Sequence, residues 1–168
     1  MSETPPRILA SLATYNERDN LAPLIAEIHR YLPALIAGMS RYDVMIGSRY
    51  VKGGGTENWP FVRRMLSKGV NSLARLLMRI PARDTSGAYR CYRVSKLRQA
   101  HLERVRSRGY SFQQEVLYRC RKAGCRIGET PIIFENRRAG ASKVNPKEAV
   151  RSMGMIIILG LAAFFGMD

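Results

Sequence analysis

Acidic residues are scarce in this chain of 168 residues, and their scarcity sets its charge. The sequence holds 13 Asp and Glu against 28 Lys and Arg, which gives a net charge of +15. Such an excess favours polyanionic partners, namely nucleic acid, anionic lipid headgroups or phosphorylated substrates. No aromatic RNA-binding signature, zinc finger or recognition-helix pattern accompanies the charge, so no specific nucleic-acid partner is expected.

Cysteine and histidine are also rare, and their positions argue against a metal site. Cys91, Cys120 and Cys125 lack the spacing of zinc ligands and cannot all pair, which fits a reducing compartment. His29 and His101 lie far apart with no ligand pattern around them. No metal ligand is therefore assigned in this sequence.

A long hydrophobic run is missing as well. Residues 153–167 form an apolar segment of 15 residues without charge, whereas a membrane-spanning helix needs roughly 20. We expect a single domain over residues 1–152, followed at 153–168 by an apolar interfacial helix or a membrane segment cut off at Asp168. The polar N-terminus contains no apolar signal region.

The stretch around which the chain is organised is a short apolar strand that begins at Asp43. It ends in Gly47-Ser48-Arg49-Tyr50, which places a hydroxyl, a guanidinium and a phenol where open α/β sheets bind ligands. Three glycines follow at residues 53–55. They allow backbone conformations closed to other residues and a close approach of a ligand.

A basic amphipathic helix is predicted next, over residues 60–80, with Pro60 in its first turn. Its basic residues are expected to share one face: Arg64, Lys68, Arg75 and Arg79. This pattern favours an anionic substrate held at a membrane surface. An ordinary surface helix with a solvated basic face is the alternative.

The remaining segments predict an α/β fold. A strand at residues 7–14 and a helix with an apolar stripe from Leu21 to Leu32 precede the Asp43 strand, as in a parallel β-α-β unit. Pro33 and Gly38 are expected to loosen the chain before the Asp43 strand. Later elements are a strand at 88–94, a helix at 96–106 and a strand at 127–135. Between them, Ser111 and Gln114 resemble a capping box for a helix that Gly124 ends.

Several motifs, in this order, resemble the family-2 inverting glycosyltransferases of the GT-A fold, and among them the dolichol-phosphate (polyprenol-phosphate) mannose synthases. They cover most of the chain, and the series from Gly47 to Ser67 is the most specific part. The motifs are Ala13-Thr14-Tyr15-Asn16-Glu17, Ile46-Gly47-Ser48-Arg49-Tyr50, Gly53-Gly54-Gly55, Asn58-Trp59-Pro60, Arg63-Arg64-Met65-Leu66-Ser67-Lys68-Gly69, Asp84-Thr85-Ser86-Gly87 and Arg137-Arg138-Ala139-Gly140-Ala141-Ser142-Lys143.

The resemblance implies a GT-A-like (Rossmann-like), mostly parallel sheet flanked by helices, with amphipathic helices at the membrane interface. It implies transfer of mannose from GDP-mannose to dolichyl or polyprenyl phosphate with Mg2+ or Mn2+. The expected location is the cytoplasmic side of a membrane, as a peripheral protein or one anchored by its C-terminal segment.

The resemblance also implies roles for individual residues. The donor would contact Tyr15, Asn16, Glu17 and Arg49. The acceptor phosphate would contact Ser48, Arg49, Arg63, Ser67, Arg137, Arg138, Ser142 and Lys143. Arg49 is the expected catalytic cation, because fixed arginines offset the repulsion between two phosphates, and Asp84 or Glu115 would steer or deprotonate the acceptor.

The chain departs from the family between Tyr15 and Tyr42, which span only 28 residues (42 − 15 + 1). The family's Asp-x-Asp motif is absent throughout the sequence, and Glu27 is the one acidic residue between Asn20 and Arg41. We therefore expect an internal deletion that impairs metal and donor binding and uncovers a strand edge or an apolar face. A non-catalytic membrane-surface module for phosphate or lipid binding, and transfer of another sugar such as glucose, remain alternatives.

Overall fold

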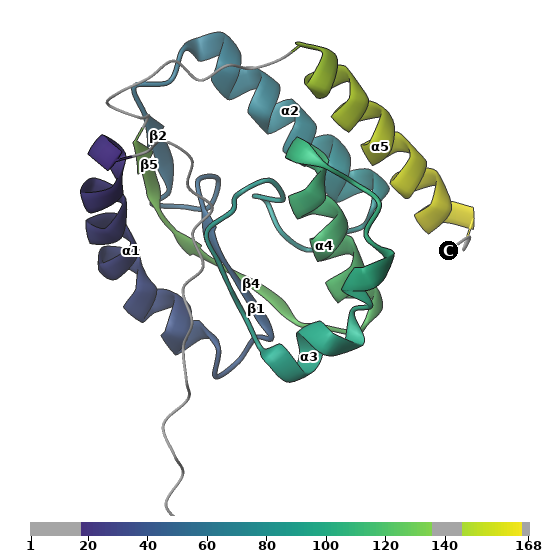
Figure 1. The fold of residues 1–168 in the computed structure, drawn as a ribbon, viewed down its shortest axis with the longest axis horizontal. Coiled ribbons are helices and arrows are strands. Elements are labelled where there is room, and N and C mark those ends of the chain that lie inside the picture. The colour runs from purple at the N-terminus through teal and green to yellow at the C-terminus, as the bar shows by residue number, and fades with distance from the viewer. Residues whose placement is uncertain (1–17, 136–145, 166–168) are drawn as a thin grey trace, which may run out of the picture.

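The structure is a computed structural model, and it describes residues 18–135 and 146–165 (Figure 1). Its elements alternate between helices and short strands, which confirms the α/β class. In chain order they are α1 (Arg18–Gly38), β1 (Val44–Ser48), β2 (Gly55–Glu57), α2 (Phe61–Leu77), β3 (Arg90–Tyr92), α3 (Val94–Gln99), α4 (Phe112–Lys122), β4 (Ile127–Pro131), β5 (Ile133–Glu135) and α5 (Pro146–Phe165).

Two small sheets form the centre of the described chain. In the first, β1 lies between β3 and β4, antiparallel to β3 and parallel to β4, with Val44 opposite Ile127. In the second, β2 and β5 pair in parallel. The single strand expected at 127–135 is divided at Ile132, whose N–H donates to the Ser48 carbonyl at 3.0 Å. The strand expected at 7–14 lies outside the described residues.

The core lies on one face of β1. Val44 and Ile46 are 1% and 0% exposed and pack with apolar residues of α2, α4, β4 and α5. These partners include Met78, Leu117 and Ile156. The other face of the first sheet contacts α1, so helices cover both faces (Figure 1).

Helix α1 continues through Pro33 and ends at Gly38, so the predicted loosening of the chain is wrong at Pro33 and confirmed at Gly38. Its C-terminal half is held against the sheet by Leu35, which is fully buried. In its N-terminal half, Leu21, Leu24 and Ile25 are 37–42% exposed. An apolar face is therefore uncovered in the described structure.

Helix α2 ends at Leu77, before the predicted Ile80. Arg79 adopts a left-handed conformation with φ 51°, and the Ile80 N–H donates to the Arg75 carbonyl at 3.2 Å. This is the hydrogen bond of a Schellman stop, with arginine where glycine is usual. Arg79 consequently lies beyond the helix rather than on its basic face.

Two further helix boundaries differ from prediction. The helix expected at 96–106 is only α3, because His101 adopts a left-handed conformation with φ 49° and the chain continues as a short 3-10 turn. Ser111 is not a capping residue, because it has helical dihedral angles and its hydroxyl makes no cap hydrogen bond. Gly124, with φ 72°, follows α4 as predicted.

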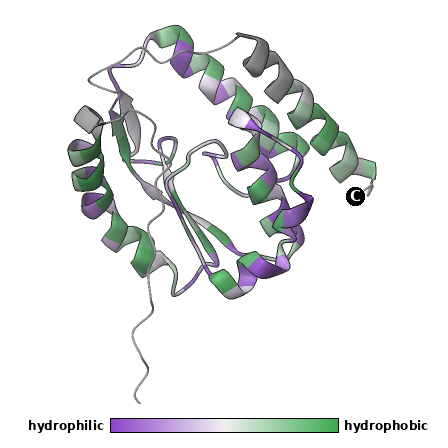
Figure 2. Cartoon of the chain, viewed as in Figure 1, coloured by the Kyte–Doolittle hydropathy of each residue, from purple (hydrophilic) through white to green (hydrophobic). Residues whose placement is uncertain are grey.

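The C-terminal helix α5 packs along α2, with Gly160 directly against Leu77 (Figure 1). Ile156 is buried in this contact, whereas Ile158, Leu161 and Phe165 are at least half exposed. Figure 2 shows that hydrophobic residues predominate in the C-terminal part of α5. None of the helices in the described part of the chain is long and apolar enough to cross a membrane.

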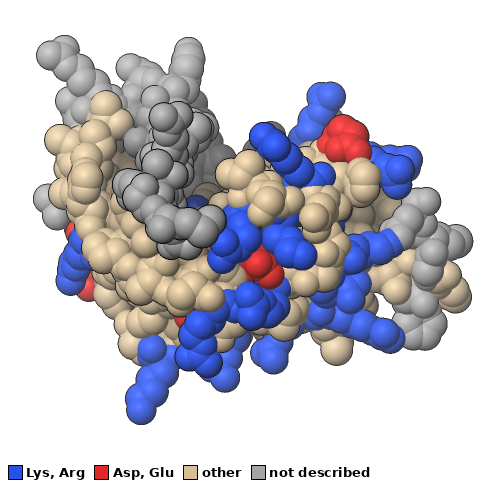
Figure 3. All heavy atoms as spheres, turned by 90° about the horizontal axis from the view of Figure 1, so that it is seen from below, with Lys and Arg blue, Asp and Glu red and all other residues tan. Residues whose placement is uncertain are grey.

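The excess of positive charge is visible on the surface. On the face shown in Figure 3, Lys and Arg side chains far outnumber Asp and Glu. The buried carboxylates of the described residues instead serve as internal acceptors: Asp43, Asp84 and Glu115 are at most 5% exposed. Few acidic side chains therefore remain to offset the basic surface.

Candidate functional site

Arg49 follows directly after β1 and forms a buried ion pair with Asp84. Its Nε and Nη2 donate to the two carboxylate oxygens of Asp84, each at 2.7 Å, and the side chains are 9% and 0% exposed. Nη2 also donates to the Ser86 hydroxyl at 2.8 Å. The pair joins the end of β1 to the turn that carries Asp84 and Ser86.

The surroundings of Asp84 keep it ionised. Burial raises the pKa of its carboxyl, but hydrogen bonds and charge from Arg49 outweigh burial, so the pKa lies below its usual value. The backbone N–H groups of Arg49 and Gly87 add hydrogen bonds of 3.0 and 2.9 Å. Asp84 is thus the counter-ion of Arg49, and any role in steering an acceptor remains a prediction.

Asn71 ties helix α2 to the same turn. Its Nδ2 donates to the Ser67 carbonyl at 2.7 Å and to the Ser86 hydroxyl at 3.0 Å. Its Oδ1 accepts from the N–H and hydroxyl of Thr85 and from the Ser86 N–H, at 2.7–3.0 Å. Sequence analysis missed this residue, although a helix-disfavouring Asn inside an amphipathic helix was an available signal.

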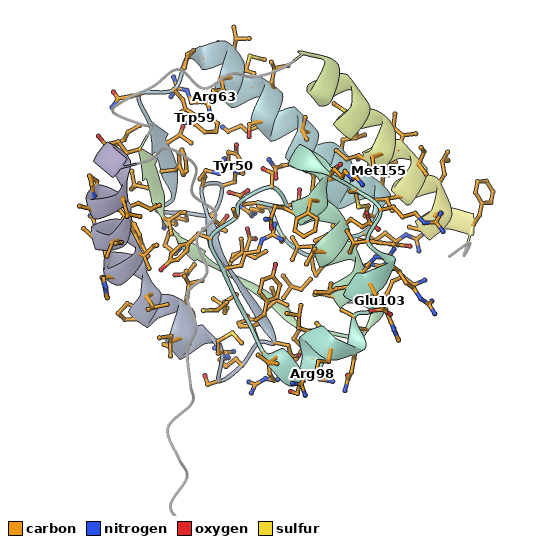
Figure 4. All side chains as sticks on the ribbon, viewed as in Figure 1. Tyr50, Trp59, Arg63, Arg98, Glu103 and Met155 are labelled. Carbon is orange, nitrogen blue, oxygen red and sulfur yellow. The ribbon has the colours of Figure 1, made fainter. Side chains whose placement is uncertain are left out.

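Two of the predicted acceptor arginines, Arg49 and Arg63, converge on one aromatic ring. The Arg63 guanidinium lies 4.1 Å from the centre of the Trp59 ring, and that of Arg49 lies 5.4 Å from it. Close by, the Tyr50 hydroxyl donates to the Ser67 hydroxyl at 2.6 Å. Figure 4 shows Tyr50, Trp59 and Arg63 at the end of α2 nearest the second sheet. The structure therefore groups Arg49, Arg63 and Ser67, whose role toward an acceptor phosphate remains a prediction.

Ser48 is fully buried, and its hydroxyl accepts from the Tyr50 N–H at 3.3 Å. The glycines that follow shape the turn around it. Gly53 takes φ 86°, and a Cβ on Gly54 would lie within 3.2 Å of the Arg49 backbone as well as against the Ser48 carbonyl. The close approach that the glycines permit is thus to the protein's own backbone.

A hollow of about 380 Å³ opens between α2, the turn after β1 and the segment before Asp84. Its lining is basic and contains no carboxylate among the described residues. The lining residues are Arg49, Tyr50, Val51, Gly54, Lys68, Asn71, Ser72, Arg75 and Arg83. Arg83 had not been singled out from the sequence.

Glu115 is bound elsewhere, in a cluster at the start of α4. Its carboxylate accepts from the Ser107 N–H at 2.7 Å and from Arg119 at 2.8 Å. Burial raises the pKa of Glu115, but the hydrogen bonds from Ser107 and Arg119 outweigh burial and lower it. Glu115 is fully buried and does not line the hollow.

The other predicted site residues lie outside the described residues. In the donor segment these are Tyr15, Asn16 and Glu17. In the later basic segment they are Arg137, Arg138, Ser142 and Lys143.

The described residues do not fit the divalent metal that the resemblance implies. No three His, Cys, Asp or Glu side chains of that part of the chain gather where they could hold an ion. The buried carboxylates of Asp84 and Glu115 are already saturated by arginine and backbone N–H groups. A divalent cation bound between phosphates needs free carboxylate or other oxygen ligands, and Asp84 and Glu115 do not offer them.

No protein-family model matches the chain. Over 135 residues, 80% of this chain and 50% of the relative, it is 37% identical to polyprenol monophosphomannose synthase of Mycolicibacterium smegmatis. Over 132 residues, 79% of this chain and 54% of the relative, it is 36% identical to undecaprenyl-phosphate mannosyltransferase of Micrococcus luteus. The chain spans about half the length of these curated relatives. The similarity supports a relationship to the polyprenol-phosphate mannosyltransferases.

Proposed function

We propose that this chain is a member of the polyprenol-phosphate mannosyltransferases and serves in the transfer of mannose from GDP-mannose to dolichyl or polyprenyl phosphate. The observation that carries the proposal is similarity over about four-fifths of the chain to two proteins whose names combine mannose with a polyprenyl phosphate. The structure adds that the guanidinium groups of Arg49 and Arg63 both lie over the Trp59 ring, and that the Ser67 hydroxyl is hydrogen-bonded to Tyr50, the neighbour of Arg49. Its α/β arrangement is compatible with a GT-A-like fold.

The chemistry explains why such a site is basic. A lipid phosphate oxygen forms a bond to the anomeric carbon of mannose, while the bond from that carbon to the donor diphosphate breaks and GDP departs. Both reactants are anionic, so their approach is repulsive in the absence of fixed cations. Arginine fits because its guanidinium stays charged and presents several N–H donors to phosphate.

The acceptor tail and the exposed surface favour a peripheral site at a membrane, and the cytoplasmic side is part of the proposal through the family alone. Phe61, Val62, Met65 and Leu66 of α2 are 58–66% exposed, next to a basic stretch of the same helix. Apolar side chains of this kind enter the lipid interface, while neighbouring cations meet anionic headgroups.

A second candidate function is a module that binds phosphate or lipid without transferring sugar. It is favoured by the lack of a metal-holding group of side chains among the described residues. An internal deletion of the donor segment would account for that lack, and the donor could then also be a nucleotide sugar other than GDP-mannose. Mg2+ or Mn2+ is included in the proposal only because the family that the chain resembles uses a divalent metal.

The test is transfer of labelled mannose. The purified chain is incubated with GDP-mannose, Mg2+ or Mn2+, and polyprenyl phosphate in detergent, beside an Arg63→Gln/Ser67→Ala variant. Labelled lipid above the level of the variant supports the transferase. Binding of polyprenyl phosphate without transfer supports the module, and neither transfer nor binding rejects both. Arg49→Ala is a poorer control, because it leaves Asp84 buried without its partner.

A further inference from the structure

The hollow beside α2 contains cations that no internal carboxylate neutralises. Of its four basic residues, Arg49 is paired with Asp84. Lys68, Arg75 and Arg83 have neither a hydrogen bond from their side chains nor an ion pair with the described residues. Three like charges around one concavity repel each other, and a bound anion relieves that repulsion.

The sequence positions of these cations explain why they meet. Lys68 and Arg75 are seven residues apart, which is about two turns of helix, so both project from the same side of α2. Ser72, between them on that side, adds a hydroxyl. Arg83 approaches from the segment before Asp84, whose backbone is fixed because the Arg83 N–H donates to Glu129 at 2.8 Å.

The hollow shares Arg49 and Tyr50 with the grouping around Trp59 but not the other members of that grouping. Arg63 and Ser67 do not line it, and the Arg63 guanidinium lies over the Trp59 ring instead. Arg63 and Ser67 project from a different side of α2 than Lys68 and Arg75. Two basic sites therefore lie along one helix.

We propose that Lys68, Arg75 and Arg83 form a second binding site, for a phosphoryl dianion, that is distinct from the Arg63 and Ser67 grouping. The volume of about 380 Å³ accommodates a phosphate monoester or a diphosphate. Lysine and arginine N–H groups are the charge-assisted donors that such a group requires. The Ser72 hydroxyl supplies one further hydrogen bond.

The phosphoryl group has two possible sources, a free diphosphate or the headgroup of a lipid. The position of the hollow suits a lipid, because Phe61 and Met65 lie on α2 about two turns before Lys68 and Ser72, respectively, and are 66% and 58% exposed. Acyl chains along these residues would place a headgroup phosphate at the hollow.

The experiment measures binding without any sugar donor. Pyrophosphate is titrated against the full chain at constant ionic strength, with sulfate as the competing anion, and the melting temperature is recorded. In parallel, vesicles containing phosphatidic acid are compared with vesicles of phosphatidylglycerol, which carry phosphodiesters with one charge fewer. Preference for pyrophosphate identifies a free diphosphate, and preference for phosphatidic acid identifies a lipid phosphate.

Matched variants assign the binding to the hollow. Lys68→Gln, Arg75→Gln and Arg83→Gln should each weaken it about fivefold, whereas Arg98→Gln, an exposed cation of α3 outside the hollow, should change it less than twofold. Without anion, Arg75→Gln should melt no lower than the parent, since it removes repulsion. Equal losses in the hollow variants and in Arg98→Gln, or no preference of either probe over its control, would overturn the proposal. Because no sugar is present, failure of mannose transfer leaves this result unaffected.

Discussion

The buried pair between Arg49 and Asp84 makes a quantitative prediction about stability. Replacing Arg49 with Met preserves the apolar stem of the side chain and strands the Asp84 carboxylate, which is 0% exposed. Breaking a buried ion pair from one side costs about 3–5 kcal/mol of the free energy of unfolding. The backbone N–H groups of residue 49 and Gly87 still bind Asp84 in the variant, so we expect the free energy of unfolding to fall by about 3 kcal/mol, the lower end of this range.

The second arm of this prediction is the double variant Arg49→Met/Asp84→Asn. It contains no unpaired buried charge, and replacing both members of a buried pair is often close to neutral. The double variant should therefore be more stable than Arg49→Met alone, with the free energy of unfolding recovered by about 2 kcal/mol. This recovery is the sign of a pair rather than of two independent contacts.

Urea unfolding followed by circular dichroism measures these differences, provided that the slope with urea stays constant. Glu27→Gln is a suitable control, because its ion pair with Arg30 is exposed, at 3.6 Å, and should contribute less than about 1 kcal/mol. If Arg49→Met lost no more stability than Glu27→Gln, the Arg49 and Asp84 side chains would not be paired in a buried site, and the reasoning would fail.

Three further predictions concern the same region. Asp84 and Glu115 have lowered pKa values, so their stabilisation should be complete above about pH 4.5 and disappear as pH falls through the folded-state values; a urea midpoint constant from pH 6 to 2 would contradict this. Gly54→Ala should destabilise by about 2 kcal/mol, because its Cβ would meet the backbone of Ser48 and Arg49, whereas Gly69→Ala, with open space at its Cβ, should stabilise by about 0.5–1 kcal/mol; equal melting temperatures would refute the contrast. Asn71→Ala should lower the free energy of unfolding by about 2–3 kcal/mol, since the backbone N–H groups of Thr85 and Ser86 lose their acceptor. A calorimetric loss of stability no larger than that of a serine-to-alanine substitution at an exposed site would contradict this prediction.

Local patterns in the sequence were sufficient to predict much of the fold. Strand β1 and helix α4 were predicted correctly because their apolar residues recur with the period of a strand and of a helix, respectively. Gly124 predicted a helix stop because glycine takes positive φ at little cost. The convergence of Arg49, Arg63 and Ser67 followed from the resemblance rather than from any local pattern.

Long-range contacts could not be predicted in the same way. The capping box failed because Ser111 belongs to a short 3-10 turn that continues into α4. The hydrogen bonds of Asn71 and the position of Arg83 depend on how a turn folds back onto a helix. Sequence periodicity also placed Lys68 and Arg75 on a membrane-facing surface, and only the packing of the later turn showed that they line a hollow.

The central position of β1 also affects how the chain is assembled during synthesis. Its parallel partner β4 begins 83 residues later, since Val44 pairs with Ile127 (127 − 44). A ribosome that has completed β1 must still make the whole of α2, β3, α3 and α4 before that partner emerges. The apolar side of β1 meanwhile lacks its native neighbours, and contacts of such long separation form slowly. The nascent chain should therefore depend on chaperones until residues 127–131 have left the ribosome.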